Sequence, residues 1–67
     1  MFRVNFFSGN VVDTKKFDNV LDALCFFEKV SSKIKEYASF EDVFTPNSLV
    51  CIRGINEGLP FELSLCD

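Results

Sequence analysis

Histidine and tryptophan are absent from this 67-residue chain, and glycine and proline are rare. Without histidine, the chain lacks the commonest general base at neutral pH, the commonest metal ligand, and any Ser-His or Cys-His arrangement for nucleophilic catalysis. Its three glycines stand apart, so no glycine-rich phosphate loop exists. These absences predict a protein that is not an enzyme and that carries neither a cofactor nor a metal ion.

The three cysteines do not have the spacing of a metal site. Cys25, Cys51 and Cys66 are an odd set without C-x-x-C or zinc-site spacing. They cannot all pair within one chain, and residues 1–5 lead into a strand-like run rather than a signal peptide. We therefore expect reduced thiols and a cytoplasmic location. No apolar run approaches the roughly 18 residues that a membrane-spanning helix needs, so no membrane association is expected.

Phenylalanine, by contrast, is abundant, with nine copies in the chain. A chain of this length predicts a single small domain over residues 1–67. About 60% of the unfolded surface would be buried on folding, a marginal fraction that a partner subunit would improve. A core filled with phenylalanine rings leaves little room for a pocket. The net charge of −3 disfavours nucleic acid as a partner, because phosphate binding depends on clustered cations.

Alternating apolar residues predict a hairpin at the start of the chain, with strands over residues 2–7 and 11–14. A two-residue loop between them would set Phe6 opposite Asp13, whereas a three-residue loop would set Phe6 opposite Val12. The three-residue loop keeps one face of the hairpin apolar, so we predict that register.

An amphipathic pattern from about Asn19 to Ala38 predicts one long helix, which Asp18 or Asn19 would cap. Its apolar stripe contains Val20, Ala23, Leu24, Phe27, Val30, Ile34, Tyr37 and Ala38. Leu21 and Cys25 fall outside that stripe, one turn apart within the polar arc. They are therefore candidates for a contact with something other than the core of the domain.

After the helix, Ser39-Phe40-Glu41-Asp42 resembles a capping box and predicts a short helical turn over residues 40–44, with Phe40 and Phe44 on one face. A strand over residues 48–55 then leads into a second hairpin with a three-residue loop, whose last position is a glycine. Pro60 in the returning strand predicts an edge position, because proline cannot donate a ladder hydrogen bond.

The predicted fold is therefore α+β, with one long helix packed on one face of a four-stranded antiparallel sheet in the order β-β-α-β-β. The uncovered sheet face would then hold four apolar residues, Phe7, Val11, Val50 and Ile52. Contiguous exposed apolar patches tend to mark partner sites, although single exposed apolar residues are common. We predict a partner contact there and a second one at Leu21 and Cys25, unless residues 40–44 fold back over that helix ridge.

Acidic residues supply another candidate contact, formed by Glu36, Glu41 and Asp42 beside Phe40. Such groups can occupy the basic nucleic-acid groove of another protein, although a solvated charged rim is the common alternative. In size, charge and hairpin–helix–hairpin plan, the chain resembles short, acidic, phenylalanine-rich accessory proteins that bacteriophages encode against host enzymes or defence systems. The resemblance implies a module that binds and inhibits a larger protein, and the uncovered sheet face predicts a homodimer.

Two alternatives stay open at this point. The lysines at positions 15, 16, 29, 33 and 35 could form a local basic patch that binds nucleic acid despite the negative net charge. A purely structural homo-oligomer is the other alternative.

Overall fold

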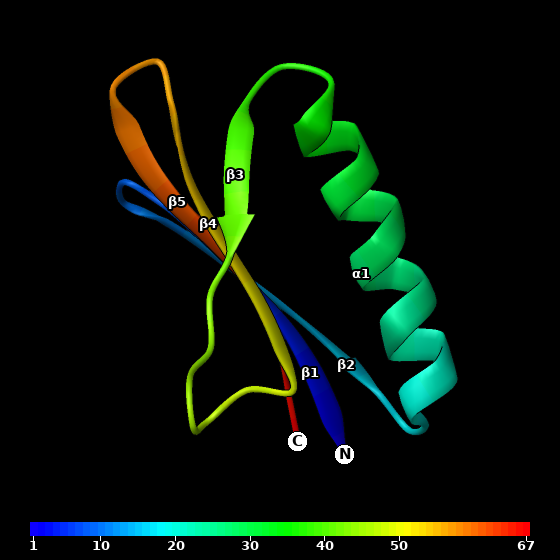
Figure 1. Ribbon diagram of the computed structural model, residues 1–67. Helices are drawn as coiled ribbons and strands as arrows, with labels where there is room; N and C mark the ends of the chain where they lie inside the picture. The colour runs from blue at the N-terminus through cyan, green and yellow to red at the C-terminus, as the bar shows by residue number, and fades with distance from the viewer.

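In the computed structural model, residues 1–67 form one helix and five strands. In chain order these are β1 (Phe2–Ser8), β2 (Val11–Phe17), α1 (Val20–Lys35), β3 (Ser39–Asp42), β4 (Val50–Asn56) and β5 (Leu59–Cys66). The strands form a single antiparallel sheet in the order β2-β1-β5-β4-β3. Helix α1 packs across one face of this sheet (Figure 1). The α+β class is confirmed, and the sheet has five strands rather than the predicted four.

The additional strand is β3, which takes the place of the predicted helical turn over residues 40–44. It pairs with Ile52–Ile55 of β4. The capping-box pattern is overridden because β4 would otherwise present a free edge of unpaired backbone groups. Phe40 packs against the core, whereas Phe44 is 91% exposed, so these two rings do not share a face.

Helix α1 begins directly after Asn19, which is one of the two caps that the sequence predicts. The Asn19 backbone is extended, and its side-chain oxygen accepts a hydrogen bond from the Asp22 N–H at 2.9 Å. The helix ends at Lys35 rather than at Ala38, because the chain turns there to enter β3. No helix is both long enough and apolar enough to cross a bilayer.

Both hairpins have two-residue loops, so both predicted registers were wrong by one residue. Gly9 has a φ of 58° in the first loop, and Phe6 lies opposite Asp13. Glu57 and Gly58 form the second loop with φ values of 53° and 81°. Two successive positive φ angles are those of a type I′ turn, which matches the natural twist of a hairpin.

The neighbour on the other side of β1 explains the register of the first hairpin. Phe6 lies opposite Leu63 of β5, and its ring centroid is 6.4 Å from that of Phe61. Because β5 supplies these apolar neighbours, β2 can remain a polar strand at the edge of the sheet. Exposed charges such as Lys15 and Lys16 on an edge strand also oppose pairing with other chains.

Pro60 lies in the central strand of the sheet, contrary to the predicted edge position. It is opposite Ile55, in the pair next to the one that closes the β4–β5 loop. Backbone groups in such a pair point away from the partner strand. On the side of β5 away from β4, the neighbouring strand β1 ends with Ser8 opposite Phe61. No strand therefore lies beside Pro60, and no ladder hydrogen bond is lost because proline lacks an N–H.

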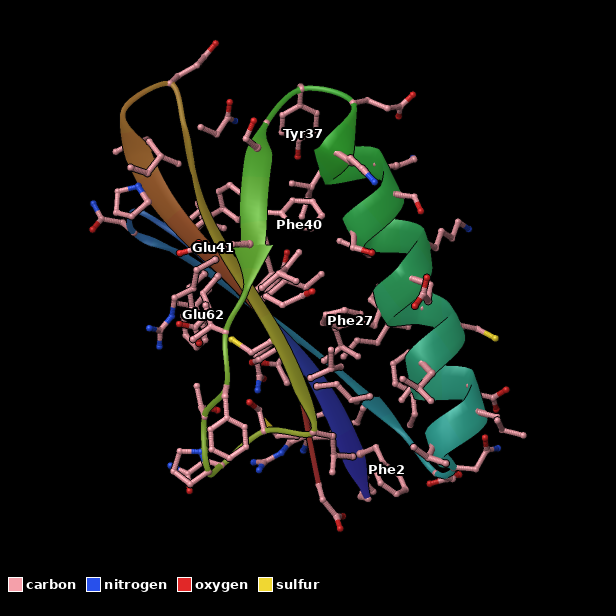
Figure 2. The ribbon with its side chains drawn as sticks, viewed as in Figure 1. Phe2, Phe27, Tyr37, Phe40, Glu41 and Glu62 are labelled. Carbon is pink, nitrogen blue, oxygen red and sulfur yellow. The ribbon has the colours of Figure 1, made fainter.

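The register of the second hairpin turns Val50 and Ile52 toward α1. Ile52 is 2% exposed and lies opposite Leu63, and Val50 packs against the same core. Their predicted place on the uncovered face was therefore wrong. The core consists of Val4, Ala23, Phe27, Ile34, Ile52, Phe61, Leu63 and Leu65. Figure 2 shows Phe27 and Phe40 between the helix and the sheet.

Candidate interaction surfaces

Exposed apolar side chains gather where the turns of the two hairpins lie side by side. Leu59 carbons are 3.9 Å from the position that a Cβ on Gly9 would occupy, so the turns are in contact. Both turns point away from the helix (Figure 1). We call the exposed apolar residues at this end the tip patch, and they are Phe7, Val11, Val12, Ile55, Leu59 and Pro60.

The tip patch wraps around the end of the sheet and does not cover a whole face. Side chains alternate along each strand, so Val11 and Leu59 lie on the face that α1 covers. The other members lie on the opposite face, which we call the open face or open side of the sheet. Val12 is 63% exposed and Ile55 is 64% exposed, and Phe7 is the least exposed of the large apolar members at 42%. Of the four residues predicted for an uncovered apolar face, only Phe7 and Val11 belong to this surface.

A charged row crosses the open face next to the tip patch. In this row, Glu62 lies opposite Phe7 on one side and opposite Arg53 on the other, and Arg53 lies opposite Glu41. Arg53 Nε donates to a Glu62 carboxylate oxygen at 2.7 Å, and this hydrogen bond raises the pKa of the Arg53 guanidinium. Glu41 and Glu62 point to the side away from the helix (Figure 2). The arginine therefore stays charged and paired at the border of the patch.

The middle of the open face is polar, which also departs from the apolar face that the sequence predicts. Thr14 Oγ1 donates to Asn5 Oδ1 at 2.9 Å, and Asn5 Nδ2 is 3.6 Å from Cys66 Sγ. The Cys66 thiol in turn lies 3.9 Å from Ser64 Oγ. Ser64 is 5% exposed although it lies on the open side. This string of polar contacts separates the tip patch from the far end of the sheet.

Cys51 lies on the same side as Ser64 and is 2% exposed. Burial raises the pKa of the Cys51 thiol, and the negative charge of Glu62 adds to the shift. All three cysteines are free, and Cys25 is exposed. A buried thiol of raised pKa is a poor nucleophile, so Cys51 is a structural residue.

The shifted Cys51 pKa predicts a loss of stability in alkali. The folded state keeps the proton longer than the unfolded state, so the stabilisation is complete below the ordinary thiol pKa of about 8.5 and is lost as the pH rises through the raised value. We expect the free energy of unfolding, measured by urea denaturation, to fall above about pH 8.5. Cys51→Ala should flatten this slope and Cys25→Ser should keep it. An unchanged slope in Cys51→Ala would contradict the expectation.

The ridge on α1 is exposed as its position outside the stripe indicates. Leu21 is 71% exposed and Cys25 is exposed, with Leu24 beside them at 37%. Residues 40–44 do not cover this ridge, because residues 39–42 are held in the sheet as β3.

The predicted acidic contact is divided between different parts of the molecule. Glu41 and Asp42 are successive residues of β3, so their side chains point to opposite faces of the sheet. Glu36 is at the C-cap of α1, and Phe40 is turned toward the core (Figure 2). These four residues therefore do not present one common surface.

The lysines are also divided. Lys15 and Lys16 point to opposite sides of β2, and Lys16 lies opposite Arg3. The Lys15 ammonium lies over the Phe26 ring, 4.9 Å from its centroid, and 5.9 Å from the centroid of Phe17. No continuous basic stripe follows from this arrangement.

Lys15 and Lys33 instead lie beside a cleft between α1 and the β1–β2 hairpin. The cleft has a volume of about 440 Å³. Its buried and half-buried walls are Val4, Phe6, Phe26, Val30, Ile34 and Leu63, and its exposed rim is Asp13, Thr14, Lys15, Lys33 and Tyr37. The expectation that the phenylalanines leave little room for a pocket was wrong, because Phe6 and Phe26 line this space without filling it.

Comparison with known proteins returns no relative of this chain. No protein-family model matches it, and no curated protein or solved structure gives a significant match. No group of three or more histidine, cysteine, aspartate or glutamate side chains is placed to hold a metal ion.

Proposed function

We propose that the chain is a non-enzymatic protein-binding module that inhibits or modulates a larger protein, and that the tip patch is its main contact surface. The observation that carries this proposal is the gathering of six exposed apolar residues at one projecting end of the sheet. Contiguous apolar patches of this kind tend to mark partner sites. The resemblance to phage accessory proteins favours a bacterial host enzyme or defence protein as the partner.

The surface area supports a need for a partner. The chain exposes 4779 Å², about a tenth more than the roughly 4,300 Å² typical of a 7.6 kDa monomer, and only 10 of its 67 residues are buried. A standard interface covers about 800 Å² on each partner, which is about a sixth of this surface. Binding at the tip patch would therefore also stabilise the folded state.

Charges around the tip patch favour a different protein over a second copy of this chain. Asp13, Glu57 and Glu62 lie beside it with Arg53. Lys35 and Glu36 line a surface hollow together with Ile55 and Glu57, so four acids and two bases leave a net charge of −2. In a two-fold dimer the same acidic rim would meet itself, and like charges would repel. An apolar hollow with basic residues around it would complement the patch.

Charge introduced into the tip patch should abolish partner capture. Val12→Asp and Ile55→Asp place a carboxylate at exposed positions, so we expect a normal fold and at least a tenfold loss of the partner captured from a bacterial lysate. Phe44→Asp, at a position that is 91% exposed and outside every candidate contact, is the matched control and should capture as much as the unchanged chain. Equal capture by all three variants, or no specific capture at all, contradicts the proposal.

Sedimentation separates this proposal from self-association. The unchanged chain should sediment as a monomer over a range of concentrations. A dimer that Val12→Asp dissociates would assign the patch to a second copy and would overturn the proposed partner.

A further inference from the structure

We propose that the cleft between α1 and the β1–β2 hairpin binds an apolar chain that ends in an anionic group, as a fatty-acid carboxylate does. The site is separate from the tip patch and does not depend on the proposed protein partner. Its ligand class follows from three properties of the cleft, which are its apolar walls, its volume and the charge at its rim.

The walls and the volume fit a small apolar ligand. Seven of the 11 lining residues are apolar. The half-buried Phe6, Phe26 and Val30 supply the accessible part of the wall, and Val4, Ile34 and Leu63, which are only 1–3% exposed, close its floor. No buried side-chain nitrogen or oxygen is left without a hydrogen-bond partner. A volume of about 440 Å³ lies within the roughly 300–1,000 Å³ of small-molecule sites. An aliphatic chain would bury its surface against these walls.

The rim is positively charged in an otherwise acidic molecule. Lys15 on β2 and Lys33 on α1 flank the cleft from facing elements, and Asp13 is the only acidic residue of the lining. The lining therefore carries a net charge of +1, and the rest of the chain carries −4, since the total is −3. An anionic head is favoured at this rim, and a cationic head is disfavoured.

The Lys15 ammonium is held at this rim. Its contacts with the Phe26 and Phe17 rings are cation–π interactions, which position it beside the apolar wall. Phe26 is itself part of the cleft lining, so the ammonium lies next to the surface that an aliphatic chain would cover. A carboxylate at the mouth could therefore reach Lys15 while its chain lies along Phe26 and Val30. Tyr37 carries a second polar group at the rim, a hydroxyl that can donate a hydrogen bond.

Three probes with the same tail and different heads test the proposal, namely dodecanoate, dodecanol and dodecylamine, each kept below the concentration at which it aggregates. We expect dodecanoate to cause saturable amide shifts at the cleft residues in heteronuclear NMR spectra. Its affinity should exceed that of dodecylamine about tenfold, because the head group exchanges attraction for repulsion. Saturable dodecanoate shifts that map to the tip patch, or no saturable shifts, would overturn the site.

Matched charge reversals on α1 separate the rim from the overall charge. Lys33→Glu should weaken dodecanoate about tenfold, whereas Lys29→Glu, one turn earlier and outside the lining, should change its affinity less than twofold. Equal effects of the two substitutions, or equal binding of dodecanoate and dodecylamine, would overturn the anionic head. Dodecanol binding as tightly as dodecanoate would also overturn the anionic head. It would assign the cleft to an uncharged group, such as an apolar side chain of a protein partner.

Two further variants tie the result to this cleft. Val30→Trp adds a larger side chain to the wall and should reduce the binding of dodecanoate and dodecanol alike. Ile55→Asp, in the tip patch on β4 and outside the cleft lining, should leave dodecanoate binding unchanged, so that loss of protein capture and loss of ligand binding are distinguishable. Dodecanoate binding that survives Val30→Trp in a folded variant would contradict the proposed location.

Discussion

Phe27→Ala should lower the free energy of unfolding by about 3–5 kcal/mol, the range for removing a buried phenylalanine ring. Phe27 is 4% exposed and belongs to the core that joins α1 to the sheet (Figure 2). Only three helix residues are buried, so the helix has few other anchors. A domain of this length has a stability of about 3–10 kcal/mol. The substitution should therefore remove at least about a third of the stability of the domain.

The matched control for that substitution is Phe44→Ala. Phe44 is 91% exposed, so its removal should change the free energy of unfolding by less than about 0.5 kcal/mol. Urea denaturation followed by far-ultraviolet circular dichroism measures both changes. Similar losses in the two variants would show that α1 does not pack on the sheet as described.

Gly54→Ala should cost about 3 kcal/mol, at the upper end for overpacking, through a collision with β3. Gly54 lies opposite Phe40 on one side and opposite Phe61 on the other. A Cβ there would collide with the backbone carbonyl oxygen of Ser39 and would lie 2.7 Å from Cζ of Phe61. The backbone of β3 cannot move aside without losing its pairing with β4, so we expect β3 to detach first.

Hydrogen exchange of the β3 amides measures this detachment, and Gly58→Asn provides the control. A Cβ at position 58 meets nothing within 4 Å, and asparagine tolerates the positive φ of that turn. The control should lose less than about 1 kcal/mol and should keep the protection of β3. Wild-type protection in Gly54→Ala would mean that β3 does not approach β4 as closely as described.

The local sequence pattern was sufficient to predict the helix and strands whose apolar periodicity is strong. The strands of both hairpins and helix α1 with its Asn19 cap follow from the alternation and the stripe in the sequence. Strand β3 could not be predicted in this way, because its four residues become a strand only beside the free edge of β4. Gly54 in the sequence indicates that another strand lies beside β4, since a glycine within a strand often marks the close approach of another backbone.

The errors in register account for most of what was missed at the surface. The alternating pattern of residues 2–7 predicted an apolar partner for Phe6 in β2, but β5 supplies that partner, so β2 can be polar. In the second loop, Glu57 adopts a positive φ that glutamate rarely takes, so its sequence did not indicate a type I′ turn. Consequently, the predicted partner surface lacked Val12, Ile55 and Leu59. It wrongly contained Val50 and Ile52, which face the helix.

The placement of β5 between β1 and β4 governs when the sheet can assemble during protein synthesis. Arg3 pairs with Cys66, so the ladder between β1 and β5 needs residues that leave the ribosome after the other four strands. Until then, the nascent chain would hold two separate strand pairs, β1–β2 and β3–β4. The apolar edges of β1 and β4 would stay unpaired. Because distant pairings form slowly, the emerging polypeptide would be open to chaperones until the central strand is released and closes the sheet.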